Sequence, residues 1–168
     1  MIYDDIIKND DIVRKDKAIR VVNHFNDGAY IEIISSMQQK FRVEFIDSNG
    51  KLEYTTTLNS NSWSKTSKKY FEKYTCKVYS GDTMIHNHVY DPTDKNVYII
   101  LDSRSLGDTI AWIPYAEEFR KKWNCNVILS TFLNHLFEDV YPEITFVQPG
   151  TVVNDVYATY RIGWYYDG

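Results

Sequence analysis

The sequence predicts an α+β protein: an antiparallel β-sandwich or small barrel, followed by the first β-α-β-α-β part of a Rossmann-like sheet. Between residues 17 and 93, apolar and polar residues alternate and turn residues recur at short intervals. Between residues 94 and 168, continuous apolar runs alternate with helical patterns. Residues 1–16 carry many charges and little apolar periodicity, which predicts a loosely docked leader.

The first part contains runs of period-two alternation, which indicate strands with one buried face. The expected strands are Ala18–Phe25, Ala29–Ile34, Phe41–Phe45, Leu52–Leu58, Tyr74–Tyr79 and Met84–Tyr90. Turn sequences that favour tight hairpins separate three of the pairs, namely Asn26-Asp27-Gly28, Asp47-Ser48-Asn49-Gly50 and Ser80-Gly81-Asp82. The segment Trp63–Phe71 interrupts the pattern and is expected to form a loop or a short helix.

The pattern changes after Asp91-Pro92-Thr93-Asp94, a run of turn-forming residues that marks the boundary. Beyond it we expect, in order, strand Val97–Leu101, helix Thr109–Trp123, strand Asn126–Ser130, helix Phe132–Val140 and strand Ile144–Val147. The segment Val152–Trp164 is apolar and aromatic but has no clear period. Three parallel strands would leave one sheet edge unpaired, so this unit is expected to be the front of a larger domain or to pair with another chain.

Composition excludes several classes of protein. The chain has 19 Lys and Arg against 23 Asp and Glu, a net charge of −4, which disfavours nucleic-acid binding. It has no apolar run near the roughly 20 residues that a membrane span needs, and no visible secretory signal. Two cysteines, Cys76 and Cys125, are too few for a disulfide framework and are expected to be free thiols in a reducing cytoplasm. The 26 aromatic residues fit either a tightly packed β protein or one that handles sugars.

The loop after the first parallel strand is the strongest candidate site, because ligands bind at the carboxyl ends of strands in open α/β sheets. Residues 102–108 include aspartates, serines and an arginine, together with Gly107, which permits a tight turn and close backbone approach. Asp108 directly precedes the helical run, so it is either the helix N-cap or a general base. One glycine does not make a dinucleotide fingerprint, and the loop lacks the ending of a P-loop.

Other polar residues are expected to be structural. His86 and His88 lie two apart on one strand face, a spacing that suits a metal, but nothing nearby completes a site. His24 and His135 are isolated. Lys65, Lys68 and Lys69 form a small basic patch beside Trp63 and Tyr70, which is either a solvated loop or a contact for an acidic partner.

The stretch Val97–Val153 resembles the N-terminal Rossmann domain of the bacterial autotransporter O-heptosyltransferases. The resemblance is carried by Leu106-Gly107-Asp108-Thr109-Ile110-Ala111-Trp112 with Pro114-Tyr115 behind it, and by the phrases "CNVILSTFLNHLF", "YPEITFVQPGT" and "IGWYYDG". The earlier segment "KFRVEFIDSNGKLEYTTTLNSNSWSKTSKKYF" resembles the family's N-terminal β-domain. Together the two segments extend the resemblance over about residues 18–168.

The resemblance implies a GT-B enzyme of the bacterial cytoplasm that transfers heptose from an ADP-heptose donor to Ser or Thr of autotransporter adhesins. Transfer in that family is inverting and metal-independent, and it needs a base that takes the proton of the acceptor hydroxyl. Carried over by position, Asp108 is the catalytic base, and Gly107, Thr109, Trp112 and Tyr115 are substrate-binding residues. An autotransporter substrate and an oligomeric assembly are the implied partners.

The family's donor-binding domain and its cysteine-bound iron motif lie outside these 168 residues, so Cys76 and Cys125 are not expected to bind iron. The chain alone is therefore expected to be inactive and to require a C-terminal glycosyltransferase domain, with no cofactor or metal of its own. The alternative is a non-catalytic module that binds a peptide or drives oligomerisation.

Overall fold

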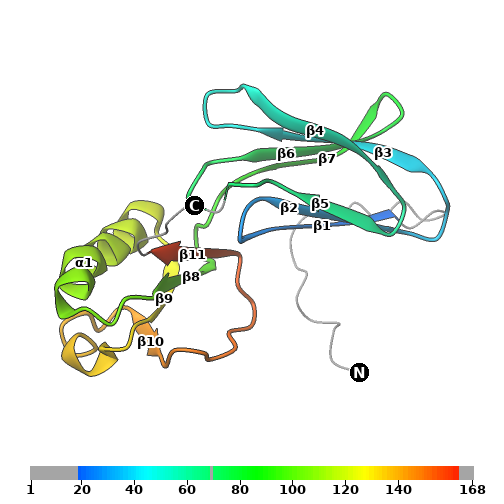
Figure 1. Cartoon of the computed structure of the whole chain (residues 1–168). Helices are drawn as coiled ribbons and strands as arrows, with labels where there is room; N and C mark the ends of the chain where they lie inside the picture. The colour runs from blue at the N-terminus through cyan, green and yellow to red at the C-terminus, as the bar shows by residue number, and fades with distance from the viewer. Residues whose placement is uncertain (1–18, 69, 163–168) are drawn as a thin grey trace. The chain divides into compact units, whose positions relative to one another are not determined.

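The computed structural model describes residues 19–68 and 70–162 of the chain. The fold is mixed α/β and consists mostly of strands, and it divides into two compact units after Tyr90 (Figure 1). The division lies beside the expected turn Asp91–Asp94. The leader expected over residues 1–16 lies outside the described residues, and so does Lys69 of the basic patch.

The first unit contains two antiparallel sheets, which form two layers in Figure 1. One sheet has the order β1-β2-β5, with bounds Ile19–Asn26, Tyr30–Ser35 and Ser62–Lys65. The other has the order β4-β3-β6-β7, with bounds Leu52–Asn59, Lys40–Ile46, Thr75–Ser80 and Thr83–Val89. Six of these strands match expected strands to within a few residues.

The alternating residues of both sheets form the core of this unit. On β2 and β3 every second side chain is buried, and the fully buried set includes Ile31, Ile33, Phe41, Val43, Phe45, Cys76 and Val78. Burying each large apolar side chain contributes roughly 1.5–3 kcal/mol before the entropy of ordering it. The ring of Phe25 on β1 meets the edge of Tyr90 at 4.9 Å and lies 5.9 Å from His88 on β7, so the two sheets contact through side chains at this end.

Strand β5 corrects the expectation of a loop or short helix at the start of Trp63–Phe71. Its four residues alternate between half-buried and exposed positions, and their serines and lysine carry no apolar period. Pairing with β2 fixes the strand instead, and buried Thr66 anchors its end. The Thr66 N–H donates to the Ala29 carbonyl at 3.0 Å, and the Thr66 hydroxyl accepts from the Ala29 N–H at 3.0 Å.

Up to residue 162, the second unit contains four parallel strands in the order β10-β9-β8-β11 and one long helix, α1. The strand bounds in that order are Thr145–Val147, Asn126–Ser130, Asn96–Leu101 and Ala158–Ile162, and α1 spans Leu106–Trp123. The expected three-strand sheet is wrong, because β11 arises from the segment Val152–Trp164 and pairs with β8 over five residues.

The expected helix Phe132–Val140 is also wrong, since only a 3₁₀ turn, η1, forms there over Asn134–Leu136. The buried side chain of Asn134 explains the difference. Its amide oxygen accepts from the Thr131 N–H at 3.0 Å, and its amide nitrogen donates to the Val147 carbonyl at 2.7 Å. These bonds tie the turn to the ends of β9 and β10, and they offer the backbone an alternative to a helix.

Helix α1 covers one face of the parallel sheet. Its residues Thr109, Ile113 and Ala116 are buried, and it packs on β8 and β9. The strand residues that alternate toward the buried side are Val97, Ile99, Leu101, Val127 and Leu129. Over the described ranges, the structure has no helix with the length and apolarity that crossing a membrane requires.

Both cysteines are buried, Cys76 on β6 and Cys125 just before β9. Burial penalises the charged thiolate, and it raises the pKa of Cys76 to about 12 and the pKa of Cys125 to about 11. Both side chains are therefore neutral thiols at physiological pH.

The substitution Gly28→Ala is expected to lower the free energy of unfolding by about 2–4 kcal/mol, because backbone strain and a close contact add up. Gly28 has φ +105°, and a Cβ there would lie 2.9 Å from the Thr66 carbonyl oxygen. Gly50→Ala is the matched control: its φ of +80° is also strained, but a Cβ there meets nothing within 4 Å. Urea denaturation measures both variants, and equal losses would contradict the close-contact argument.

The two thiols are expected to resist modification while the protein is folded. With a pKa of about 12, Cys76 has a thiolate fraction at pH 8 about a thousandfold below that of an exposed thiol, whose ordinary pKa is 9.0. Reaction with a disulfide reagent at pH 8, in buffer and in urea, measures the effect. Native rates within tenfold of the unfolded rates would contradict it.

Candidate functional site

The strand order places the candidate site at the carboxyl end of β8. From β8 the chain moves to β9 and then to β10, and it returns to β11 on the other side of β8. In open α/β sheets, the crevice for a ligand lies at the carboxyl ends of the strands where the order reverses in this way. Polar residues lie at the carboxyl end of β8 on both faces of the sheet. One group lies beside the start of α1, and the other lies on the face opposite α1.

Ser105, and not Asp108, is the N-cap of α1. Ser105 has extended backbone angles, its hydroxyl accepts from the Asp108 N–H at 3.4 Å, and its carbonyl accepts from the Thr109 hydroxyl at 2.9 Å. The helix therefore begins at Leu106, three residues before the expected start, and the N-cap interpretation of Asp108 is wrong. Ser105 and Asp108 have the spacing of a capping box, and the bond from the Asp108 N–H to the Ser105 hydroxyl is the half of it that forms, which explains why the helix starts here. Pro114 lies inside the helix.

The Asp108 carboxylate takes part in a short chain of hydrogen bonds. The Ser103 hydroxyl donates to Asp108 Oδ2 at 2.6 Å, and the Ser105 N–H donates to the Ser103 hydroxyl oxygen at 3.0 Å. We call Ser103, Ser105 and Asp108 the helix-side site. In an ordinary capping box the carboxylate would reach the N-cap N–H directly, whereas here a serine hydroxyl stands between them. The carboxylate is thus oriented by a hydroxyl group.

Gly107 and Thr109 have different environments from those the sequence suggested. Gly107 is in the first turn of α1 and is not among the described residues with positive φ, so the tight-turn argument for it is wrong. A Cβ at Gly107 would meet only the Ser105 hydroxyl oxygen, at 3.7 Å, which leaves the first turn open to close approach. Thr109 is 1% exposed, and its hydroxyl bonds the helix start.

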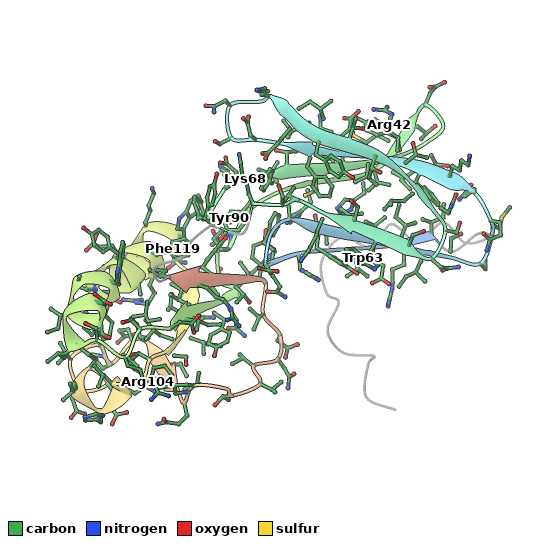
Figure 2. All side chains as sticks on the ribbon, in the orientation of Figure 1. Arg42, Trp63, Lys68, Tyr90, Arg104 and Phe119 are labelled. Carbon is green, nitrogen blue, oxygen red and sulfur yellow. The ribbon has the colours of Figure 1, made fainter. Side chains whose placement is uncertain are left out.

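Trp112 and Tyr115 lie on the same flank of α1 as Asp108, because they follow it by four and seven residues. Both side chains are exposed, and their ring centroids are 6.1 Å apart. Phe119, labelled in Figure 2, continues this flank and packs edge-on against Tyr160 of β11 at 5.9 Å. The structure therefore brings three of the five expected site residues, Asp108, Trp112 and Tyr115, together along one flank.

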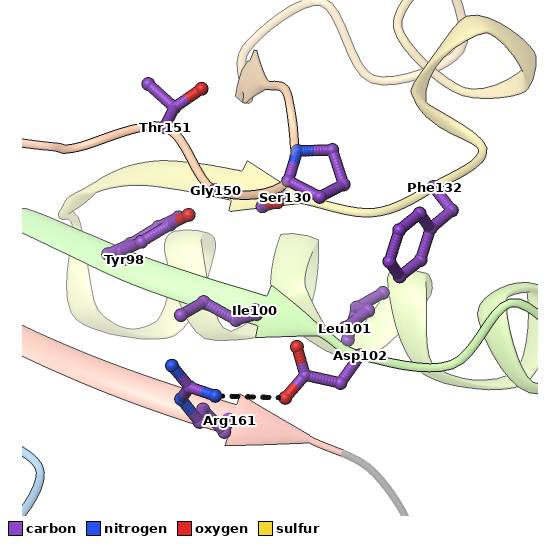
Figure 3. Close-up of a pocket in the computed structure, with 10 residues that line it drawn as sticks. Tyr98, Ile100, Leu101, Asp102, Ser130, Phe132, Gly150, Thr151 and Arg161 are labelled. Atoms are coloured by element: carbon purple, nitrogen blue, oxygen red, sulfur yellow. Dashed lines mark hydrogen bonds and ion pairs between the residues drawn. The ribbon is translucent and has the colours of Figure 1, made fainter.

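Sequence reasoning missed a pocket on the other face of the sheet, which Figure 3 shows. We call it the open-face pocket; its volume is about 270 Å³. It is lined by Tyr98, Ile100, Leu101, Asp102, Ser130, Phe132, Pro149, Gly150, Thr151 and Arg161. Asp102 pairs with Arg161 at 3.4 Å. Finding this pocket required β11, which has no clear period in the sequence.

The remaining polar candidates have structural partners. His86 Nε2 lies 3.3 Å from Asn23 Oδ1, and burial lowers the pKa of His24, which stacks on Tyr30 at 4.4 Å. In the part of the chain that the structure describes, His, Cys, Asp and Glu form no group of three that could hold a metal.

Two lysines of the basic patch form ion pairs. Lys65 bonds Asp27 at 3.0 Å and Lys68 bonds Glu53 at 3.1 Å, so their charges are largely balanced within the first unit. This arrangement favours the interpretation of the patch as part of a solvated surface.

Comparison with known proteins confirms the resemblance to autotransporter heptosyltransferases. The chain is 30% identical over 154 residues to the autotransporter heptosyltransferase BAHTCr of Citrobacter rodentium, and the match covers 88% of the chain and 37% of BAHTCr. It is 31% identical over 99 residues to the inactive autotransporter heptosyltransferase BimC of Burkholderia thailandensis, covering 57% of the chain and 23% of BimC. No protein-family model matches the chain.

The fold is similar to that of a solved relative. The crystal structure of TibC, an iron-containing dodecameric glycosyltransferase from enterotoxigenic E. coli H10407, superposes with a TM-score of 0.78 at 27% identity. This match covers 88% of the chain and 39% of TibC. The chain thus spans less than half the length of the relatives it matches.

Replacing the N-cap in Ser105→Ala is expected to lower the free energy of unfolding by about 1 kcal/mol, because the first turn of α1 loses a hydrogen-bond acceptor. Ser48→Ala is the control, since Ser48 is a turn serine whose bond to Glu72 uses its backbone N–H. Urea denaturation compares the two variants. A loss no larger than that of the control would contradict the assignment of the cap.

Proposed function

We propose that this chain is the acceptor-side part of a protein O-glycosyltransferase of the heptosyltransferase type. It would act in the bacterial cytoplasm and direct a sugar from a nucleotide donor to Ser or Thr of an autotransporter adhesin. In this proposal the first unit is a β-sandwich, and the second is the front of a Rossmann-like domain within a GT-B enzyme. The confirmed resemblance to autotransporter heptosyltransferases supports the class of reaction.

One observation carries the assignment of Asp108 as general base: its carboxylate already accepts a hydrogen bond from a serine hydroxyl, at 2.6 Å. A general base must lie within about 2.6–3.2 Å of the hydroxyl whose proton it takes. The acceptor is itself a Ser or Thr hydroxyl, so it can replace Ser103 at the same carboxylate oxygen. That exchange substitutes one hydroxyl donor for another of the same kind.

The flank of α1 supplies a surface for the acceptor chain beside the base. Trp112 is 40% exposed and Tyr115 is 65% exposed, and both follow Asp108 along the helix. Exposed aromatic rings bind peptide chains well because they offer large contact areas with few rotatable bonds. Gly107 lets the backbone of the acceptor come close to the first turn. Thr109 contributes indirectly, because its buried hydroxyl holds the Ser105 carbonyl.

The mechanism we propose is a single displacement. As the acceptor oxygen attacks the anomeric carbon of the donor sugar, Asp108 takes its proton, the bond to the nucleotide breaks, and the configuration inverts. The base is worth about 10²–10⁴ in rate, a typical contribution from general base catalysis. The donor would be bound by a C-terminal glycosyltransferase domain, so the 168 residues alone would be inactive. Because TibC is dodecameric, we also propose an oligomeric assembly.

The alternative, a non-catalytic module for peptide binding or oligomerisation, is favoured by one comparison. BimC, which matches 57% of the chain, is an inactive heptosyltransferase. A protein similar in sequence to part of this chain is therefore described as inactive.

The substitution Asp108→Asn is expected to reduce transfer at least ~100-fold, because the amide cannot take a proton. Transfer from ADP-heptose to an autotransporter peptide is measured with the chain alone and with the chain plus a polypeptide carrying the part of TibC that it does not match. Activity is expected only in the mixture. Asp82→Asn, at an exposed hairpin in the first unit, is the control. Peptide binding without transfer by any variant would favour the non-catalytic module.

Inversion and metal independence have their own readouts in the same mixture. With the β-linked donor ADP-D-β-D-heptose, which is bound in one TibC structure, inversion gives an α-linked product that NMR identifies. Adding EDTA is expected to leave the rate unchanged. A β-linked product would contradict the single displacement, and a rate that falls with EDTA and recovers with a divalent cation would contradict metal independence.

A further inference from the structure

The open-face pocket contains none of the site residues expected from the sequence, and it lies across β8 from the helix-side site. Successive residues on a strand point to opposite faces, so Ile100 and Asp102 project from the same side of the sheet, and the buried Leu101 between them also lines the pocket. The chain then turns back to Ser103 and Asp108. The carboxyl end of β8 therefore separates two groups of polar side chains, one on each face.

The pocket combines aromatic walls with hydroxyl and charged groups. Figure 3 shows Ile100 on its floor between Tyr98 and Phe132, with Gly150 and Thr151 along one side and the Asp102–Arg161 pair along the other. Ser130, which is 1% exposed, also lines it. The guanidinium of Arg104 lies 4.7 Å from the Phe132 ring, on which it packs. The position of Phe132 is thereby restrained from outside the pocket.

The charges of the pocket balance each other. Asp102 and Arg161 carry opposite charges 3.4 Å apart, and they are the only ion pair among the lining residues that the structure describes. Such a pair neither attracts nor repels an ion strongly, but it offers carboxylate acceptors and guanidinium donors to neighbouring hydroxyls. Both side chains are partly exposed, Arg161 at 61% and Asp102 at 45%, so their polar atoms remain accessible to an uncharged ligand that carries several hydroxyl groups.

We propose that the open-face pocket binds an uncharged monosaccharide unit. A pyranose ring has an apolar face of C–H groups that packs on aromatic side chains, here Phe132 and Tyr98. Its hydroxyls suit Asp102, Arg161 and Thr151, which line the same space. The volume of about 270 Å³ holds one sugar ring but no nucleotide-sugar as a whole.

The link between this pocket and catalysis rests on the proposed function. The sugar could come from the nucleotide donor, or it could be one already attached to the acceptor near the reacting hydroxyl. Both sources present the same ring chemistry to the pocket. They differ in what is attached to the ring, either a diphosphate or a peptide, and this difference separates them experimentally.

The binding experiment uses the 168-residue chain and simple probes. Methyl α-D-mannopyranoside is titrated to 100 mM while amide NMR shifts are followed. Saturable shifts are expected for Phe132, Gly150 and Thr151, with a dissociation constant that is the same at 50 and 500 mM NaCl. Phe132→Ala and Asp102→Asn are each expected to weaken binding at least tenfold. Trp63→Ala is the control, because Trp63 is an exposed ring in the other unit.

The proposal would be overturned if the sugar caused no saturable shift at these residues, or if Trp63→Ala weakened sugar binding as much as the pocket variants do. It would also be overturned if inorganic phosphate bound at the same residues in a salt-sensitive way, because the pocket would then be an anion site. Circular dichroism and urea denaturation verify that each variant is folded. A variant that does not fold is replaced by Thr151→Val, which removes a hydroxyl from the rim and is expected to weaken binding threefold or more.

The source of the sugar is decided by two further titrations. ADP-heptose is compared with ADP, and a heptosylated Ser peptide with the same peptide unmodified. In one of the two pairs, the probe with the sugar is expected to bind more tightly than the probe without it, and this difference is expected to disappear in Phe132→Ala. That pair identifies the source of the sugar. Lost sugar binding in a variant that keeps full transfer would overturn the role of the pocket and leave the transferase proposal standing. Sugar binding by the pocket, without transfer by the mixture of the chain and the TibC part, would overturn the transferase proposal and leave the sugar pocket standing.

Discussion

The parallel pairing of β11 with β8 determines where chemistry can occur in the second unit. Five residue pairs place Arg161 beside Ile100, so that its guanidinium reaches Asp102 at the end of β8. Without this pairing, β8 would have an open edge, and its carboxyl end would be an ordinary turn. With this pairing, β8 lies between β9 and β11, and the chain leaves β8 toward one side of the sheet and returns on the other. Open α/β sheets form ligand sites at such reversals of strand order. The open-face pocket and the helix-side site both depend on that position.

A single strand end supports two sites because side chains alternate along it. Leu101 is buried, Asp102 lines the open-face pocket, and the Ser103 hydroxyl bonds Asp108 at the start of α1. The helix start adds further order, since the Ser105 N–H bonds Ser103, which in turn bonds Asp108. The polar groups of the helix-side site are held by short local contacts, whereas Asp102 is held by the long side chain of Arg161. Only a few residues separate the proposed base from the proposed sugar pocket along the chain.

Sequence patterns predicted the elements that contain a clear pattern of apolar residues of their own. Apart from β5, the strands of the first unit and β8 through β10 have alternating or continuous apolar residues, and they were located to within a few positions. The failures share another cause. Strand β5 is polar, β11 reads Ala158-Thr159-Tyr160-Arg161-Ile162, and η1 depends on Asn134; in each, distant backbone partners decide the structure. The loop around Asp108 was predicted from its place at the end of a parallel strand, but the sequence analysis named Asp108 as the candidate N-cap, and the N-cap is Ser105. The pocket required β11 and could not be predicted.

The hydrogen bond to Asp108 helps to distinguish a structural carboxylate from a reactive one. A carboxylate that only caps a helix is stabilised most by accepting a hydrogen bond from a backbone N–H. The direction of that N–H is fixed by the backbone at the helix start. Asp108 instead accepts from the Ser103 hydroxyl, whose hydrogen can rotate to another acceptor without moving the backbone. The Ser105 N–H bonds the same hydroxyl oxygen and keeps it satisfied when its hydrogen turns away. The site can therefore exchange Ser103 for an incoming hydroxyl without breaking the start of α1. A base must release its resting partner in this way, whereas a cap has no need to.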